Sequence, residues 1–258
     1  MPQWNVLPMN TSKVGSFGLL LPVTMVFDAH QILLASPLLA LFDEYASNFE
    51  HSLVQELGYT GFERLRGGFD RAFGGTPPTF GRAVDAGCGT GLVGEQFRNI
   101  TTHLIGVDLS QAILDTAQQK RPGLYDEAIA GDVTEVFVEK KPLDLIVAAD
   151  AYIYFGDLDP LFASMADGLK VGAYAAFTLE NVGLEVEQSL SESKPDWRWQ
   201  LTASGRFAHR KEYVEAVSKA HQFRVKHYEA LDGFRYEQGV AVRGHLFVLQ
   251  KMDEKDEL

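Results

Sequence analysis

Cysteine is nearly absent from the 258-residue chain, which contains Cys88 and no other. A single cysteine excludes an intrachain disulfide and a cysteine-rich zinc site. None of the seven histidines has another histidine four residues away, so a helical two-histidine metal site of the H-E-x-x-H type is excluded as well. We therefore expect no metal site in this protein.

Positive charge is also scarce. The chain has 23 lysines and arginines against 35 aspartates and glutamates, which gives a formal net charge of −12 at pH 7. An acidic surface repels the phosphate backbone of DNA and RNA, so the composition argues against broad electrostatic binding to either. We expect no nucleic-acid partner.

No apolar run is long enough to cross a membrane. The segment Val14–Phe42 carries one formal charge, but Pro22 and Pro37 interrupt it, and no uninterrupted stretch reaches the ~18 apolar residues of a membrane-spanning helix. The final residues, 255–258, spell Lys-Asp-Glu-Leu, an endoplasmic-reticulum retrieval signal. Because the N-terminal leader is poor, we expect a cytoplasmic protein, with the lumen of the reticulum as the alternative.

The remaining composition is that of a globular protein, with 46% hydrophobic and 22% charged residues. Apolar runs alternate with helical patterns, which predicts an α/β fold with a mostly parallel, doubly wound sheet and helices on both faces. We expect strands at 82–86, 103–108, 143–149, 172–179, 223–231 and 241–250, the last two pairing antiparallel, and helices at 38–57, 62–73, 91–98, 110–120, 157–169 and 209–220. The predicted organisation is an N-terminal extension (1–36), one domain (37–251) and an acidic tail (252–258).

A glycine-rich turn follows the first of these strands. The segment Arg82–Leu92 reads as a strand, a turn containing Gly87, Gly89 and Gly91, and the start of a helix. Such a turn at the carboxyl end of a parallel strand is where open α/β sheets bind nucleotides. The generic dinucleotide pattern G-x-G-x-x-G also occurs at 89–94, so both a dinucleotide and another nucleoside cofactor are candidates.

The charge of Asp85 separates these candidates. This carboxylate ends the strand before all the glycines, so we expect it to point into the pocket that the turn encloses. A pyrophosphate there would face a like charge in a partly desolvated site. A ligand carrying a sulfonium and an ammonium would be attracted by the same carboxylate. The charge pattern therefore favours S-adenosylmethionine over NAD.

The ends of the next strands add polar groups suited to a nucleoside. Asp108 ends the second strand and can accept hydrogen bonds from both ribose hydroxyls, and Leu109 can cover one face of adenine. We expect Asp132 to accept the adenine amino group and the amide of Val133 to donate to a ring nitrogen. Asp150 ends a further strand and is a candidate cofactor-binding residue, with a helix-capping role as the alternative.

The spacing of these motifs resembles that of class I S-adenosylmethionine-dependent methyltransferases. Three further segments, Phe42–Ala46, Asp150–Leu158 and Ser204–His209, are similar to the bacterial methyltransferases associated with TPR repeats, and the resemblance covers roughly 37–251. Residues 1–36 are too short for an array of 34-residue TPR units. The resemblance implies a sheet of seven strands, the last one antiparallel, and S-adenosylmethionine as the cofactor.

Candidates for the acceptor side follow from the same segments. His209 and Tyr154 are the candidate bases for an acceptor whose proton must be removed. Tyr45, Tyr152 and Arg206 are candidate substrate-binding residues; core packing is the alternative for the two tyrosines, and a surface ion pair is the alternative for Arg206.

We thus expect methyl transfer to a nitrogen, oxygen or carbon atom of a small-molecule acceptor. A protein methyltransferase, a non-catalytic module on the same fold and an NAD-dependent oxidoreductase are the alternatives.

Overall fold

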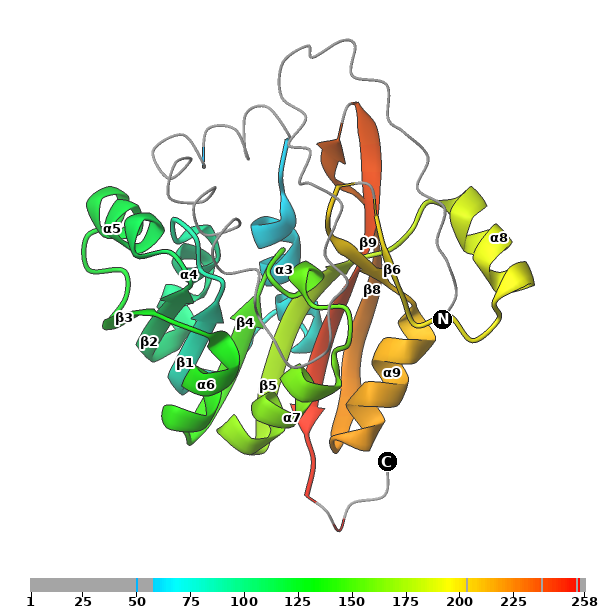
Figure 1. Cartoon of the computed structure of the whole chain (residues 1–258). Helices are drawn as coiled ribbons and strands as arrows, with labels where there is room; N and C mark the ends of the chain where they lie inside the picture. The colour runs from blue at the N-terminus through cyan, green and yellow to red at the C-terminus, as the bar shows by residue number, and fades with distance from the viewer. Residues whose placement is uncertain (1–49, 51–57, 203, 238, 254, 256–258) are drawn as a thin grey trace, which may run out of the picture.

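The computed structural model describes residues 50, 58–202, 204–237, 239–253 and 255 (Figure 1). The expected extension at 1–36 and the helix expected at 38–57, apart from Glu50, lie outside these residues. The strands are β1 (Phe80–Ala86), β2 (Thr101–Asp108), β3 (Glu127–Ala130), β4 (Leu143–Ala148), β5 (Leu169–Glu180), β6 (Trp199–Leu201), β7 (Phe207–His209), β8 (Phe223–Glu237) and β9 (Val240–Lys251). The α-helices are α3 (Gly61–Ala72), α4 (Leu92–Phe97), α5 (Gln111–Lys120), α6 (Val133–Glu139), α7 (Asp159–Gly168), α8 (Leu184–Ser193) and α9 (Lys211–Ala220), and short 3-10 turns occur at η2 (Arg98–Ile100) and η3 (Tyr152–Tyr154).

The strands of the described residues form one sheet. Strands β3, β2, β1, β4 and β5 lie side by side in this order and run parallel. Strand β9 pairs antiparallel with β5 and with β8, so a seven-stranded path with one antiparallel strand is present, as the sequence predicted. Strand β5 continues beyond the last residue of β4 that it pairs with, and the short hairpin of β6 and β7 joins it there, where Glu180 pairs with Ala208.

The core has two parts, one on each face of the sheet. Phe69 of α3 and Phe97 of α4 pack with the inward side chains of β1 and β4 on one face. Helices α6, α7 and α9 cover the other face, where Phe137, Phe162 and Val214 are fully buried. The doubly wound arrangement brings the carboxyl ends of β1, β2, β3, β4 and β5 to a single rim (Figure 1).

The fold differs from the sequence expectation in three places. The strand expected to close around Asp132 ends at Ala130, and Asp132 caps α6, a helix that was not expected. The chain after β4 turns into η3, so Tyr152 and Tyr154 do not alternate along a strand. The stretch 181–206, in which no regular element was expected, contains α8 and β6, and His209 ends β7 instead of opening a helix.

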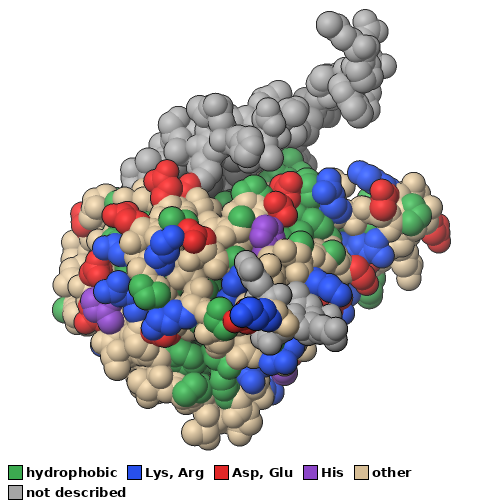
Figure 2. All heavy atoms as spheres, turned by 90° about the horizontal axis from the view of Figure 1, so that it is seen from below, with side chains coloured by type: hydrophobic (Ala, Val, Ile, Leu, Met, Phe, Trp, Pro, Cys, Tyr) green, Lys and Arg blue, Asp and Glu red, His purple; other side chains and the backbone are tan. Residues whose placement is uncertain are grey.

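Two surface features bear on possible partners. Among the described residues, no helix is long and apolar enough to cross a membrane. In the view of Figure 2, acidic and basic side chains are interspersed, and no continuous basic area appears on that face.

Candidate functional site

The turn after β1 requires its three glycines. Gly87, Gly89 and Gly91 have φ angles of 67°, 53° and 98°, all in the left-handed region that side chains other than glycine rarely adopt. A Cβ atom on Gly87 would lie 2.4 Å from the Cβ of Ala151, and one on Gly91 would lie 2.7 Å from a methyl carbon of Leu124. The turn is therefore a tight backbone cradle packed directly against the residue that follows Asp150.

Asp85 lies beneath this turn and is completely buried. Its Oδ2 accepts a hydrogen bond from the hydroxyl of Tyr125 at 2.7 Å, while Oδ1 has no hydrogen-bond partner among the described residues. Burial raises the pKa of Asp85 to about 7, although the Tyr125 hydroxyl and the backbone amide of Gly94 oppose this change. The site thus holds a desolvated carboxylate with one oxygen free to accept, and no cation bonds to it within the described chain.

The end of β2 is tied to the same turn. Oδ2 of Asp108 accepts from the Gly89 amide and Oδ1 from the Ser110 amide, both at 3.0 Å. Leu109, the next residue, leaves 36% of its surface exposed, which is unusual for a leucine between two buried elements. Asp108 and Leu109 thus lie at the carboxyl end of β2, next to the glycine turn, and their roles toward a ribose and a base stay predictions.

Asp132 follows β3 and caps α6. Its Oδ1 accepts from both the amide and the hydroxyl of Thr134, each at 2.7 Å. Val133 is the first residue of α6 and packs partly against the core. The first amides of a helix have no partner within the helix, and Val133 is at such a position; its donation to an adenine nitrogen stays a prediction.

Asp150 has a strained backbone and a half-satisfied side chain. Its φ of 56° is unusual for a residue other than glycine, and its amide donates to Thr178 Oγ1 at 3.0 Å. Oδ2 accepts from the guanidinium of Arg235, whereas Oδ1 is buried and has no hydrogen-bond partner among the described residues.

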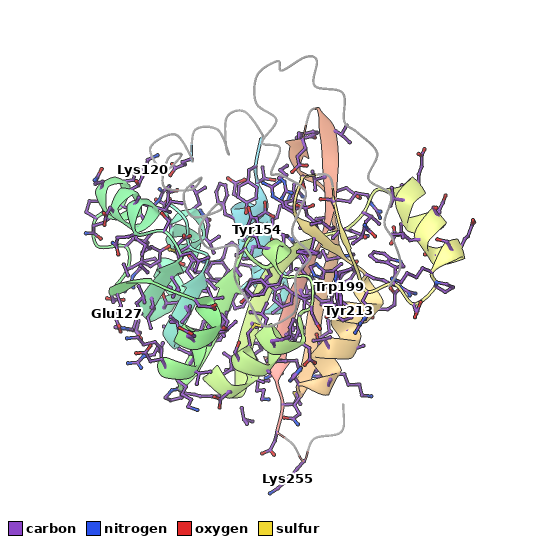
Figure 3. The ribbon with its side chains drawn as sticks, in the orientation of Figure 1. Lys120, Glu127, Tyr154, Trp199, Tyr213 and Lys255 are labelled. Atoms are coloured by element: carbon purple, nitrogen blue, oxygen red, sulfur yellow. The ribbon has the colours of Figure 1, made fainter. Side chains whose placement is uncertain are left out.

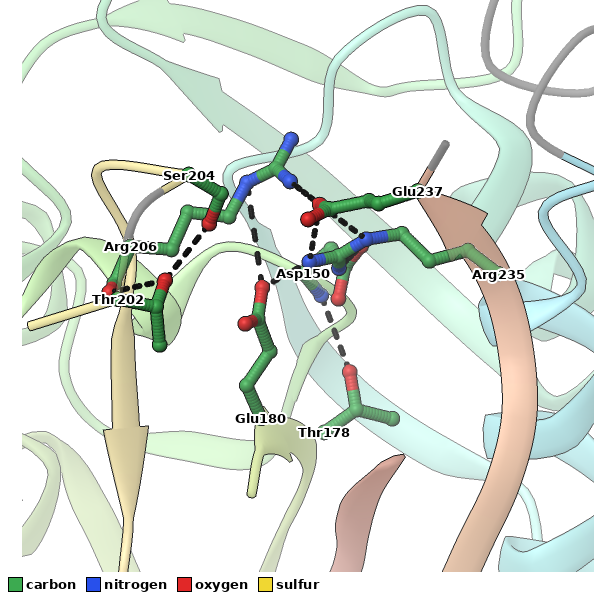
Figure 4. Close-up of polar contacts among 8 residues, drawn as sticks. All are labelled: Asp150, Thr178, Glu180, Thr202, Ser204, Arg206, Arg235 and Glu237. Carbon is green, nitrogen blue, oxygen red and sulfur yellow. Dashed lines mark hydrogen bonds and ion pairs between the residues drawn. The ribbon is translucent and has the colours of Figure 1, made fainter. Parts of the chain in front are cut away.

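Asp150 belongs to a buried group of charges that the sequence did not reveal. Arg235 of β8 is completely buried and bonds to Asp150, to Glu180 at the end of β5 and to Glu237 (Figure 4). Arg206, just before β7, reaches Glu237 and lies 4.0 Å from Glu180. We call these five residues the rim ion cluster. Burial acts to lower the pKa of both arginines, but neighbouring negative charges outweigh it and raise both values, so both guanidinium groups stay charged.

The candidate base His209 is completely buried at the end of β7. Its Nε2 lies 3.1 Å from the carbonyl oxygen of Gly156, and its Nδ1 has no hydrogen-bond partner among the described residues. Burial lowers the pKa of His209 to about 4, so the ring is neutral at physiological pH. Its ring stacks at 6.3 Å on that of Tyr213, whose hydroxyl donates to Asp157, so these two rings hold the loop before α7.

The three candidate tyrosines differ in their surroundings. Tyr152 is completely buried, its hydroxyl meets the sulfur of Met165 at 3.5 Å, and burial raises its pKa, so the structure supports core packing. Tyr154 hydrogen bonds with Arg206 and lies close to the sheet rim in Figure 3, in which Trp199 and Tyr213 lie beside each other. Tyr45 lies outside the described residues.

The comparisons with known proteins agree with this geometry. A family model described as a methyltransferase domain matches residues 83–172, which include the glycine turn, Asp108, Asp132 and Asp150. Residues 83–172 are therefore similar to a methyltransferase domain. No curated protein matches the sequence.

Solved structures of methyltransferases share the fold. An S-adenosylmethionine-dependent methyltransferase from Clostridium acetobutylicum ATCC 824 is 16% identical, with a TM-score of 0.57 over 83% of this chain and 100% of that chain. One from Leishmania major is 14% identical, with a TM-score of 0.57 over 73% of this chain and 72% of that one. Magnesium protoporphyrin IX methyltransferase from Synechocystis PCC 6803, with bound S-adenosylhomocysteine, is 14% identical, with a TM-score of 0.54 over 74% and 81% of the two chains. The predicted class I fold is confirmed, and the match of residues 83–172 supports the predicted methyltransferase class.

Sequence reasoning missed four residues of this region: Tyr125, Glu180, Arg235 and Glu237. A weak signal existed for Glu180, which ends an otherwise apolar strand in the same manner as Asp85 and Asp108. Arg235 had none, because a strand with alternating polar residues does not show which of them are buried.

Proposed function

We propose that this protein transfers the methyl group of S-adenosylmethionine to a small-molecule acceptor. The observation that carries the proposal is the buried Oδ1 of Asp85, an acceptor without a partner beneath a three-glycine turn in a methyltransferase domain. A desolvated carboxylate favours a cationic ligand and repels a pyrophosphate. S-adenosylmethionine fits this site because it carries two cationic groups and a nucleoside.

The cofactor side is formed by residues from the ends of three strands. Asp85, Gly87, Gly89 and Gly91 surround the charged end of the cofactor. Asp108 holds the ribose, and Leu109 covers the base. Asp132 and the Val133 amide recognise the adenine edge. The exposed surface of Leu109 and the amide of Val133 at the helix start support these assignments.

The chain's own contribution to the chemistry is placement. The methyl carbon on a sulfonium is already an electrophile, so the acceptor must be held in line at ~3–3.5 Å with water excluded. Tyr154, beside Arg206, is the base candidate nearest the rim ion cluster, while His209 positions the loop at Gly156 and stays neutral. The similarity to the TPR-associated subgroup and the cytoplasmic location stay predictions.

The experiment is transfer of a labelled methyl group from S-adenosylmethionine in a cell extract. After incubation with the protein, the extract is separated into small molecules and macromolecules. We expect label in the small-molecule fraction, and none above background with Asp85→Ala. Label on protein would show a protein methyltransferase instead, and binding of cofactor with no transfer to any fraction would show a non-catalytic module.

A further inference from the structure

The rim ion cluster adjoins the cofactor turn without being part of it. Asp150 directly precedes Ala151, the residue against which Gly87 packs. The other members come from the ends of β5 and β8 and from the turn before β7, on the far side of β4 from Asp108. In the proposed function, a group at this place faces the acceptor, not the adenosine.

The charges of the cluster do not balance. Asp150, Glu180 and Glu237 carry three negative charges and Arg206 and Arg235 two positive ones, so the sum is 2 − 3 = −1. An unbalanced charge in a buried group is unfavourable unless a further partner neutralises it. The cluster therefore favours a cation over an anion.

The hydrogen bonds of the cluster also favour a positively charged ligand. Nε, Nη1 and Nη2 of Arg235 all donate to carboxylates of the cluster, so this guanidinium is directed at the cluster's own negative charges. One polar atom of the cluster is buried and has no hydrogen-bond partner among the described residues: Oδ1 of Asp150, an acceptor whose side chain is only 12% exposed. A buried carboxylate oxygen without a donor is unfavourable, because desolvation is not offset by a hydrogen bond.

Asp150 is also held in place for this task. Its left-handed backbone is fixed by the hydrogen bond from its amide to Thr178, and its other oxygen is fixed by Arg235. Backbone in an unfavourable conformation persists where neighbouring contacts hold it, and such positions are concentrated at ligand sites. A group that is already held in place loses little freedom when a ligand binds. The free oxygen is thus presented in one orientation beside the cofactor turn.

We infer that the acceptor carries an amino group, and that Oδ1 of Asp150 receives an N–H of this group while the rim ion cluster supplies the balancing negative charge. This inference rests on the proposed function. It assigns Asp150 to the acceptor side of the site and makes Arg235 a positioning residue that holds Asp150 and Glu180. Arg206 then closes the cluster and does not bind an acidic substrate.

The test uses probes of opposite charge. The full-length protein, saturated with S-adenosylhomocysteine, is titrated with phenethylamine and cadaverine and, separately, with phenylacetate and glutarate, which have similar carbon skeletons. We expect both amines to bind about tenfold or more tightly than the acids. Tighter binding of the acids, or no binding of any probe up to its solubility limit, would overturn the inference.

The variants Asp150→Asn and Asp144→Asn form a matched pair. Asparagine tolerates the left-handed backbone of Asp150, and Asp144 lies near the start of β4, the strand that Asp150 follows, and pairs with Lys170. We expect Asp150→Asn to weaken amine binding about tenfold or more, while its affinity for S-adenosylhomocysteine changes less than about twofold, and Asp144→Asn to leave both unchanged. An equal loss of S-adenosylhomocysteine affinity in Asp150→Asn would assign Asp150 to the cofactor and overturn the inference. Failure of the wild-type protein to bind S-adenosylhomocysteine would instead refute the proposed function itself.

Discussion

Two buried carboxylates, Asp85 and Asp150, stand at neighbouring strand ends in opposite electrostatic states. Asp85 has a tyrosine hydroxyl as its partner and no bonded cation among the described residues, and burial raises its pKa to about 7. Asp150 is locked to Arg235 within the rim ion cluster. We call the part of the rim around Asp85 and the glycine turn the cofactor half, and the part formed by the rim ion cluster the acceptor half. The cofactor half leaves a negative charge for its ligand to neutralise, whereas the acceptor half neutralises most of its negative charge with its own arginines.

The largest effect we expect comes from removing the internal cation. Arg235→Met leaves the carboxylates of Asp150, Glu180 and Glu237 buried without their shared partner. Breaking a buried ion pair by removing one side typically destabilises a protein by about 3–5 kcal/mol. Urea unfolding measures this loss. The control Arg224→Met, on the same strand but exposed, should change stability by less than about 0.5 kcal/mol. A loss of stability in Arg235→Met as small as that of the control would show that the carboxylates of the rim ion cluster do not depend on Arg235 for neutralisation.

Removing the unpaired carboxylate should act on binding instead of folding. We expect Asp85→Ala to lower the affinity for S-adenosylmethionine by about 100-fold or more, because the cationic ligand loses its buried counter-charge. Isothermal titration calorimetry measures the affinity, with Asp115→Ala on exposed α5 as the control. Near-normal affinity in Asp85→Ala would refute the assignment of the cofactor site.

The pH dependence of stability gives a third way to sharpen the comparison. Because the folded pKa of Asp85 is about 7, above its unfolded value, the folded state keeps a proton that the unfolded state loses as the pH rises. Between about pH 5 and pH 8, the free energy of unfolding of the wild type should fall by about 2 kcal/mol relative to Asp85→Asn. Urea titrations of both proteins across this range measure it, and parallel curves would contradict the raised pKa.

The smallest expected effect concerns the neutral histidine of the acceptor half. The folded pKa of His209 is about 4, below its unfolded value, so acid favours the unfolded state, which binds the proton more readily. Between about pH 7 and pH 5.5, the wild type should lose about 1 kcal/mol of stability relative to His209→Gln, whose amide can still donate to Gly156. Thermal unfolding at both pH values checks this. An equal loss in the two proteins would place a charged, solvated histidine at this position.

The two halves also differ in how far the sequence predicts them. The strand, the glycine turn and Asp85 are consecutive, and Asp108 follows after one helix and one strand, so local pattern and spacing were enough to bring them together. The parallel sheet followed in the same way from alternating apolar runs, and β8 and β9 pair as expected.

The acceptor half escaped prediction because it is assembled over long distances in the chain. Asp150, Glu180 and Arg235 meet only because β9 inserts between β5 and β8 and because β5 continues beyond β4. The position of His209 was missed for a related reason: the β6–β7 hairpin is stabilised by pairing with Glu180 of β5, not by its own pattern of apolar residues.

The most direct test of the central claim is a calorimetric titration of the wild-type protein with S-adenosylmethionine and, separately, with NADH. The unpaired carboxylate of Asp85 predicts an affinity for S-adenosylmethionine at least about 100-fold higher than that for NADH, and a much smaller preference in Asp85→Asn. Equal or tighter binding of NADH by the wild type would contradict the account.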